Sequence, residues 1–498
     1  MSAWEPVIGL EVHVELDTET KMFCACAVTK GDSPNTHTCP VCLAHPGALP
    51  VVNQRAIEYA ARIALALNCT VQPRNIFHRK NYFYPDLPKA YQISQFDEPL
   101  ATGGWFEYWV GDEKLRCRIN RVHMEEDAAK LVHAGGDAGR IAGSTYSVVD
   151  FNRGGTPLIE IVSEPDIPSP AAAREFLQQL RNLVVELGVS ACNMEEGQIR
   201  WDANLSMRVA GSSELGTRTE LKNMNSFRYL QQALEAEMPR QTEILEAGGK
   251  IDQETLHFDH DTGATTPLRS KEEAHDYRYF PEPDLVPLVL DEAWVQAQRA
   301  ALPELPQARV ERFEREYGLS RYDAFGLGSA GPLASFYEQA VDAGASAGTA
   351  VDTGAGTAVD AKLIANWTMG EYLAHLNAAG LEPGQGHVTA ERLAALVGLI
   401  AAGTISGSAA KEVFKLMVEE HAEPGDIVAK HGLGQISDEG AIEAAVTQVL
   451  ADNPAQVEQY RAGKQQVLGF FVGHVMKVTR GRANPQLVNE LVRKALDT

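Results

Sequence analysis

The feature that most constrains the fold is a change in residue pattern near residue 294. Before it, short strand-like runs alternate with turns and a few helical segments, and after it the chain consists of amphipathic helical patterns. Strands followed by helices predict an α+β domain and then all-helical domains. Because 498 residues are too many for one core, about three domains are expected. We place their boundaries at 1–293, 294–430 and 431–498.

Residues 7–15 alternate between apolar and polar side chains, which predicts a strand. Glu11, His13 and Glu15 fall on one face of it, and Val12 and Val14 on the other. The polar face fits an ordinary sheet edge as well as a compact set of metal ligands, so the pattern alone leaves both open. The same criteria predict helices at 56–67 and 171–187 and strands at 158–162 and 203–208. Together these elements indicate a domain built on a mainly antiparallel sheet.

His123-Met124-Glu125-Glu126-Asp127 places three consecutive carboxylates beside an imidazole. Such groups repel one another, so a solvated surface segment is one interpretation. The other is a hard divalent cation, since Mg²⁺ takes oxygen ligands and turns the repulsion into attraction.

Seven cysteines are present, and four of them lie in one short segment as Cys24-x-Cys26 and Cys39-x-x-Cys42, with 12 residues between the pairs. This spacing favours a structural zinc site with four thiolates over a set of unbound buried thiols. Cys69, Cys117 and Cys192 lie apart and are expected to be small core residues. An odd cysteine count used in this way indicates a reducing cytoplasm.

Two aromatic, proline-containing segments, 78–96 and 276–284, lack periodicity and are predicted to be ordered functional loops. In the first, lysine or arginine side chains are suited to hold a phosphate, and the tyrosines to stack on a base or ribose. The alternative is a rigid aromatic loop packed between two sheets.

The charge distribution separates the C-terminal segment from the rest of the chain. The formal net charge is −23, yet seven basic residues face two acidic ones in 461–498. A basic tail on an acidic protein favours a polyanionic partner over a merely solvated face. An apolar stripe at Ile442, Ala445, Val446, Val449 and Leu450 predicts a helix there.

Several motifs carry no chemistry in our interpretation. Residues 326–331 match a dinucleotide fingerprint but follow no strand, so we expect a loop before a helix starting near Pro332. Residues 341–360, in which Gly-Thr-Ala-Val-Asp occurs twice, are expected to be a flexible insertion. The first residues lack a signal-peptide pattern, and the longest apolar run, 393–402, is too short to cross a bilayer.

Taken in order, several long motifs resemble the B subunits of bacterial aspartyl/glutamyl-tRNA amidotransferases. They are VIGLEVHVEL, RKNYFYPDLPKAYQISQ, HMEEDAAK, GTPLIEIVSEPD, ELKNMNSFRY, DYRYFPEPDLVPL and ANPQLVNELVRK. The likeness runs from about residue 6 to the C-terminus and is interrupted mainly at 341–360.

The resemblance implies a cradle-shaped α+β domain related to glutamine synthetase, then a helical domain and a small helical tail. It implies a heterotrimer with an amidase subunit, which releases ammonia from glutamine, and a small third subunit. The side-chain carboxylate of misacylated Glu-tRNA(Gln) or Asp-tRNA(Asn) would be phosphorylated by ATP in the present chain, and channelled ammonia would displace the phosphate.

By position in the family motifs, the resemblance implies the following roles. The Mg²⁺ ligands would be Glu11, His13, Glu125 and Glu126, with Glu220 a weaker fifth. Lys80 would hold phosphate oxygens of ATP, next to Tyr82. Zinc at Cys24, Cys26, Cys39 and Cys42 would be structural and dispensable to the mechanism, as only some members carry it. The basic tail would grip the tRNA mainly through phosphates and shape.

Three alternatives remain beside this interpretation. The chain could be a tRNA-binding scaffold whose acids are structural. It could be the archaeal glutamate-specific relative, but 20 small residues are far too few for the domain inserted in that branch. It could be an ammonia ligase acting on a free metabolite, but a small substrate has no use for a basic helical tail.

Overall fold

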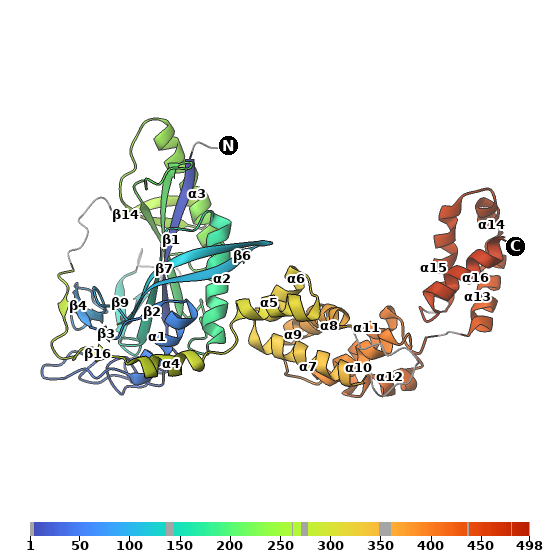
Figure 1. Cartoon of the computed structure of the whole chain (residues 1–498), viewed down its shortest axis with the longest axis horizontal. Coiled ribbons are helices and arrows are strands. Elements are labelled where there is room, and N and C mark those ends of the chain that lie inside the picture. The colour runs from blue at the N-terminus through green and yellow to red at the C-terminus, as the bar shows by residue number, and fades with distance from the viewer. Residues whose placement is uncertain are drawn as a thin grey trace. The chain divides into compact units, whose positions relative to one another are not determined.

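The structure is a computed structural model that describes residues 4–135, 144–260, 262–269, 277–347, 360–435, 438–479 and 481–497. The chain divides into two compact units, Met1–Gln307 and Ala308–Thr498 (Figure 1). The first is built on a sheet with covering helices, and the second is helical. The α+β class and the change to helices are therefore confirmed, whereas the relation to glutamine synthetase and the three domain boundaries stay predictions.

One nine-stranded sheet organises the first unit, in the order β14-β13-β12-β11-β1-β10-β7-β6-β2. All neighbours are antiparallel except β12 and β13, which are parallel. The predicted strands at 7–15, 158–162 and 203–208 are confirmed as β1, β10 and β11. The strands are β1 (Trp4–Glu15), β2 (Thr70–Val71), β6 (Ala101–Val110), β7 (Glu113–Glu126), β10 (Pro157–Ser163), β11 (Ile199–Val209), β12 (Thr219–Lys222), β13 (Thr255–Asp259) and β14 (Ala264–Arg269).

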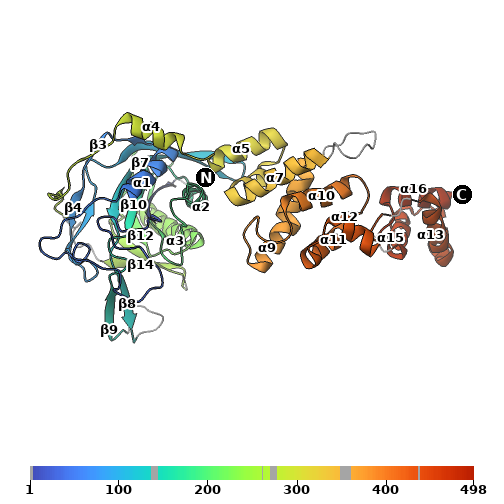
Figure 2. The same cartoon turned by 90° about the horizontal axis from the view of Figure 1, so that it is seen from below.

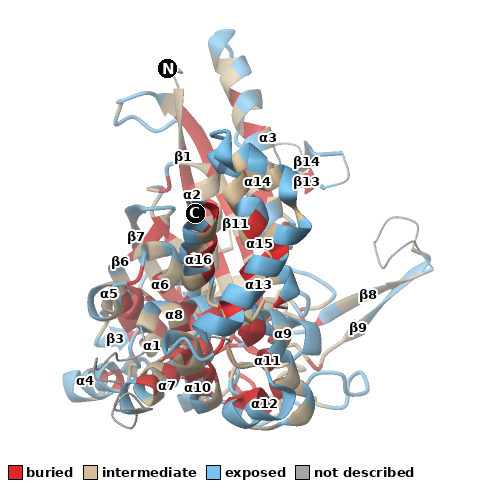
Figure 3. Cartoon of the chain, turned by 90° about the vertical axis from the view of Figure 1, so that its right-hand side faces the viewer, coloured by how far each residue is buried: buried red, intermediate tan, exposed pale blue. Residues whose placement is uncertain are grey.

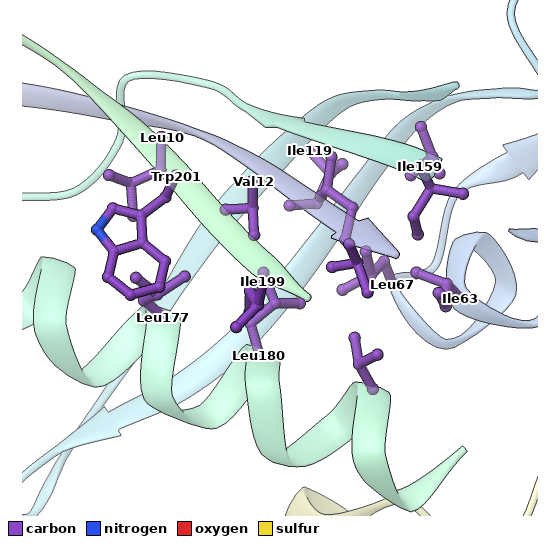
Figure 4. Packing of buried hydrophobic residues seen from close by; sticks show 14 of the residues in the cluster. Leu10, Val12, Ile63, Leu67, Ile119, Ile159, Leu177, Leu180, Ile199 and Trp201 are labelled. Atoms are coloured by element: carbon purple, nitrogen blue, oxygen red, sulfur yellow. The ribbon is translucent and has the colours of Figure 1, made fainter. Parts of the chain in front are cut away.

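Helices cover one face of this sheet and bury its apolar side chains. They are α1 (Gln54–Ala66), α2 (Pro170–Glu186) and α3 (Phe227–Glu246), while α4 (Glu292–Ala300) packs on α1. Figure 4 shows Leu10 and Val12 of β1 in one cluster with Leu177 and Leu180 of α2. Ser169 starts α2 by accepting a hydrogen bond from the backbone N–H of Ala172. Because strand side chains alternate, this packing leaves the polar residues of β1 on the opposite face.

Three smaller sheets surround the main one, namely β15-β4-β5, β16-β3 and the hairpin β8-β9. Their strands are β3 (Arg74–Asn75), β4 (His78–Asn81), β5 (Tyr91–Ser94), β8 (Lys130–Ala134), β9 (Tyr146–Asp150), β15 (Phe280–Pro281) and β16 (Leu288–Val289). Segment 78–96 is thus not a loop throughout, because β4 and β5 pair within it. Arg79 of β4 also meets a partner far along the chain, since it donates a hydrogen bond to Glu282.

The second unit holds two separate hydrophobic cores. One is formed by residues within 310–428 and the other by residues within 442–496. The first is built from α5 (Pro306–Tyr317), α6 (Arg321–Gly328), α7 (Gly331–Ala347), α8 (Ala361–Trp367), the π-helical turn η2 (Thr368–Tyr372), α9 (Leu373–Ala379), α10 (Ala390–Ala401), α11 (Gly407–Glu420) and α12 (Pro424–His431). The second is built from α13 (Glu439–Asp452), α14 (Pro454–Arg461), the 3₁₀ turn η3 (Gln465–Val467), α15 (Leu468–Val478) and α16 (Pro485–Asp497). Figures 2 and 3 show these helices from below and coloured by burial.

The stripe predicted from Ile442 is confirmed, since Ile442, Val446 and Val449 are buried on α13. Two other expectations need correction. Gly326–Gly328 is helical rather than a loop, because these residues close α6, where Leu327 and Gly328 are buried. Residues 341–347 continue α7, while both repeats of the expected insertion fall almost wholly outside the described residues, as does Arg480 of the basic tail. Among the described residues, the helices are too short or too polar to cross a membrane.

Candidate active site

On the polar face of the main sheet, ionisable residues of neighbouring strands lie directly opposite one another in the strand register. In the β1–β10 ladder His13 lies opposite Glu160, and in the β10–β7 ladder Glu160 lies opposite His123. On the other side of β1, Glu11 lies opposite Asp202 of β11. Directly opposed residues share a face and have neighbouring side chains. Antiparallel register therefore brings residues from distant parts of the chain into one cluster.

Glu160 lies at the centre of the first group. Its Oε2 is 3.3 Å from His13 Nε2 and 3.2 Å from His123 Nε2, and His13 Nε2 is 3.7 Å from Glu125 Oε1. Glu125 is also 3.3 Å from the Ser94 hydroxyl, which donates to it. Potential ligand atoms of His13, Glu125 and Glu160 all lie within 4.8 Å of one another. An imidazole and two carboxylates at this separation fit a divalent cation.

Electrostatics keep this group charged despite its burial. Burial lowers the pKa of His123, but the charge of Glu160 and hydrogen bonds to Glu125 and Glu160 outweigh it and raise the pKa to about 9. Burial raises the pKa of Glu160, yet the charge of His123 and hydrogen bonds from both histidines hold it well below its usual value. The pKa of Glu125 is also lowered, since the His123 hydrogen bond and the charge of Lys80 overcome burial.

Lys80 of β4 supplies a positive charge beside these acids. Burial lowers the pKa of its ammonium, but Glu125, the phenol of Tyr279 and Glu160 raise it further than burial lowers it. The Lys80 Nζ lies 5.0 Å from the centre of the Tyr277 ring, a cation–π distance. Lys80 is therefore a charged group, ready to meet an anion on the polar face.

A second acidic group lies next to the first, on β1, β11 and β12. Potential ligand oxygens of Glu11, Asp202 and Glu220 lie within 4.8 Å of one another. Lys222 Nζ is 2.7 Å from Asp202 and 3.0 Å from Glu220. Burial, followed by the charge of Glu160, raises the pKa of Glu11. That repulsion is what a bound cation would relieve.

The polar face opens into a cavity of about 1110 Å³. His13, Glu125, Lys80, Tyr82 and Asp202 are among its lining residues. A cationic part of the wall carries Arg153 and Arg200, both held by the buried Asp127, with Arg200 Nη2 2.8 Å and Arg153 Nε 3.7 Å from Asp127 Oδ2. The cavity thus presents carboxylates, the imidazole of His13 and cations together, groups that suit a phosphoanhydride and a carboxylate.

The structure brings most predicted site residues together but separates Glu126 from them. Adjacent strand residues point to opposite faces, so Glu126 turns away from Glu125. Its carboxylate pairs with Lys89 and accepts a hydrogen bond from the Ile93 N–H at 3.0 Å. The expected set of Glu11, His13, Glu125 and Glu126 is therefore corrected: Glu125 and His13 share one group, Glu11 belongs to the neighbouring one with Glu220, and Glu126 joins neither.

Two residues of these groups, Glu160 and Asp202, were not identified from the sequence, and His123 was assigned no role there. A usable signal existed for Glu160, since it is the one acid in the apolar run Leu158–Val162. Asp202 offered a weaker signal, as an acid between apolar neighbours in β11.

The four clustered cysteines form a separate group. Their sulfur atoms lie within 4.8 Å of one another, and Cys39 Sγ and Cys42 Sγ are 3.9 Å apart. Lys21, which is fully buried, brings its Nζ to 3.7 Å from Cys42 Sγ. A hydrogen bond from Cys24, followed by smaller effects that include the charge of Lys21, lowers the pKa of Cys42 to about 4. Four thiols at this spacing fit a tetrahedral zinc site. Cys69, Cys117 and Cys192 are buried in the core, as predicted.

Comparison with known proteins gives matches along nearly the whole chain. Residues 6–296 match the model of the GatB/GatE catalytic domain, and residues 350–496 match that of the GatB domain. Proteins named as the B subunit of aspartyl/glutamyl-tRNA(Asn/Gln) amidotransferase are similar over their full length. The one from Moorella thermoacetica is 52% identical, covering 99% of this chain and 100% of its own. The one from Carboxydothermus hydrogenoformans is 51% identical, covering 100% and 99%, and the one from Persephonella marina is 50% identical, covering 99% of each.

Proposed function

Since this chain belongs to the family of aspartyl/glutamyl-tRNA(Asn/Gln) amidotransferase B subunits, we propose that it carries the ATP-dependent transamidation of misacylated tRNA in its sheet cavity. It converts Glu-tRNA(Gln), Asp-tRNA(Asn) or both to the correctly amidated products. The enzyme is a glutamine-hydrolysing ligase in which this chain phosphorylates the side-chain carboxylate and accepts ammonia.

The observation that carries this proposal is the cluster of His13, Glu125 and Glu160, of which His13 and Glu125 line the cavity together with Lys80. A carboxylate is a poor electrophile, so it must become an acyl phosphate before ammonia can attack its carbon and expel phosphate. Phosphoryl transfer asks the protein mainly for positioning and charge neutralisation. Lys80 lines the cavity and supplies a cation for phosphate oxygens.

The residues fit Mg²⁺, which when bound would neutralise phosphate oxygens and help align the attacking carboxylate. Two places suit it, the group of His13, Glu125 and Glu160 and the group of Glu11, Asp202 and Glu220. The histidines and Ser94 hold the carboxylates in position through the hydrogen bonds and ion pairs given above. Tyr82 lines the same cavity and is available to contact the nucleotide of ATP.

The further parts of the proposal concern partners and the zinc site. The ammonia would come from an amidase subunit through a channel, within a heterotrimer that includes a small third subunit, in the cytoplasm. The helical tail at 431–498 would hold the tRNA through its basic residues. Zinc on Cys24, Cys26, Cys39 and Cys42 would be structural, because four thiolates leave no ligand position for a substrate.

Variants of Lys80 and Glu125 test the catalytic role against that of a tRNA-binding scaffold. In the reconstituted complex, Lys80→Ala and Glu125→Gln should abolish ATP-dependent amidation while glutamine hydrolysis and tRNA affinity persist. Lys114→Ala is the matched control, since Lys114 is a lysine of the same unit paired with Glu107 outside the cavity. Normal amidation by both site variants would leave the scaffold role as the function. Assays with each misacylated tRNA, with and without ATP, identify the substrate.

A further inference from the structure

We propose that the exposed side chains of Phe83 and Tyr84, which follow the cavity residue Tyr82 and which we call the aromatic rim, stack on the bases of the unpaired 3′ end of the tRNA. The inference rests on the proposed function and names the part of the substrate that this surface recognises. It concerns positioning of the substrate and not the chemical step.

Exposure of the rim is the first observation. Phe83 is 88% exposed and Tyr84 is 52% exposed, which makes them adjacent large apolar side chains facing solvent. Single exposed apolar residues are common and need no explanation. Two in a row, directly after the cavity-lining Tyr82, form a surface of the kind that binds a ligand.

The backbone beneath these rings is firmly held, so their exposure is not the result of a loose loop. Leu87 is buried, and its N–H donates to the Tyr84 carbonyl at 3.0 Å. The Asp86 carbonyl accepts a hydrogen bond from Ala129 N–H at 3.0 Å, and Lys89 pairs with the buried Glu126. A rigid loop that presents aromatic rings binds at a low entropic cost.

On its inner side the rim continues into the active cavity. Tyr82 lines that cavity together with Lys80, and Phe83 directly follows Tyr82 in the chain. The Tyr82 and Tyr277 rings meet edge to face, with centroids 6.0 Å apart. Asn81 ties the two segments together, since its N–H donates to the Tyr277 carbonyl at 3.0 Å.

Continuity with the cavity determines which molecule fits the rim. The reacting carboxylate belongs to an amino acid esterified to the terminal ribose of the tRNA, so only one amino-acid side chain separates the terminal nucleotide from Lys80. The last bases of a tRNA are unpaired, and unpaired bases are bound by aromatic rings with a nearby cation. The rim therefore adds exposed aromatic surface beside the cavity in which the amino acid would react.

A binding cycle with the assembled complex tests this assignment. The affinity of uncharged tRNA(Gln) is measured for the intact molecule and for one lacking its unpaired 3′ nucleotides, with wild type, Phe83→Ala and Phe83→Trp. Phe83→Ala should weaken binding of intact tRNA by about 5- to 150-fold, the range for loss of one stacked base. It should leave the truncated tRNA unaffected, and Phe83→Trp should restore binding.

Tyr146→Ala is the matched control, because Tyr146 is an aromatic residue of the same unit that is 62% exposed on β9. Equal weakening of intact and truncated tRNA by Phe83→Ala, or no weakening of either, overturns the assignment. Loss of a partner protein from the Phe83→Ala complex also overturns it, since the rim would then cover protein. The cycle uses uncharged tRNA and no ATP, so its outcome is independent of whether the cavity performs the amidation.

Discussion

Arg79→Ala should destabilise the small sheet that holds Lys80, because it leaves the buried carboxylate of Glu282 without its positively charged partner. Arg79 of β4 donates hydrogen bonds from Nε and Nη2 to the two carboxylate oxygens of Glu282, at 2.7 and 2.8 Å. The Glu282 side chain has no exposed surface, whereas that of Arg79 is 21% exposed. The pair joins two segments separated by 203 residues in the chain.

The magnitude follows from this asymmetry in burial. Removing the guanidinium leaves a carboxylate buried without its partner, which costs about 3–5 kcal/mol. Glu282→Gln leaves a guanidinium that is still partly exposed to water. This variant should lower the free energy of unfolding by about 1.5–3 kcal/mol, the contribution of a hydrogen bond to a charged group. The double variant Arg79→Ala/Glu282→Gln should cost less than Arg79→Ala alone, because no unpaired charge remains. Arg79→Lys keeps the charge without the two-pronged geometry and should fall between wild type and Arg79→Ala.

Amide hydrogen exchange measures the effect locally, which a melting curve of a two-unit chain does not. Two amides report on this sheet, those of Asn81, bonded to the Tyr277 carbonyl, and Glu282, bonded to the Phe77 carbonyl. In Arg79→Ala their exchange should accelerate by about 10²- to 10⁴-fold, up to the limit set by global unfolding. Amides of α13 in the other unit serve as the internal control and should exchange at the wild-type rate.

Strict additivity of the two single variants would refute the reasoning, because it would mean that Arg79 and Glu282 do not interact. A double variant that costs more than Arg79→Ala would refute it as well. The functional consequence is that amidation by Arg79→Ala should fall while Lys80 itself is intact, since β4 no longer holds the ammonium beside Glu125.

Three further predictions concern the acid groups and the cysteines. Glu160→Gln should raise the Mg²⁺ concentration needed for half-maximal amidation by at least about 10- to 100-fold, since Glu160 is a proposed ligand and even outer partners of metal ligands have effects of this size. An unchanged Mg²⁺ titration would place the cation elsewhere. Cys39→Ser should reduce bound zinc from one per chain to less than one and lower the melting temperature of the first unit. Metal analysis and calorimetry under reducing, chelator-free conditions measure the two effects. Absence of zinc from the wild-type protein under these conditions would contradict the site. Burial, then the charge of Asp127, raises the pKa of Glu15 to about 8 from its usual 4.5. Between these two pH values the folded state keeps a proton that the unfolded state has released. The free energy of unfolding of the wild type therefore falls as pH rises towards 8. Glu15→Gln should therefore gain stability relative to wild type between pH 5 and 8 in melts without added divalent cation, and a constant difference would contradict the assigned protonation.

Local patterns were sufficient for the main elements and for part of the site. Alternation at 7–15 predicted β1 and the face that carries Glu11 and His13, because side-chain direction in a strand follows directly from residue parity. The cysteine spacing predicted a cluster that the structure assembles within 4.8 Å. The roles of Lys80 and Glu125 came from family resemblance, and the cavity contains both.

The same parity rule, applied to 123–127, would have separated Glu125 from Glu126. Once the segment is recognised as the end of β7 and not a loop, neighbouring acids cannot serve the same face. What concealed this was the charge of the segment, which favours a solvated loop when strand partners are unknown.

By itself, the sequence determined the change from strands to helices, the strands β1, β10 and β11, the apolar and polar faces of β1, the cysteine cluster and the family. These depend on neighbouring residues or on motifs that are read along the chain. Only the tertiary structure decided that Glu160 lies between His13 and His123, that Asp202 joins Glu11, and that Glu126 belongs to Lys89. The reason is that these contacts arise from the register between strands, and register is set by the packing of the whole sheet on its helices.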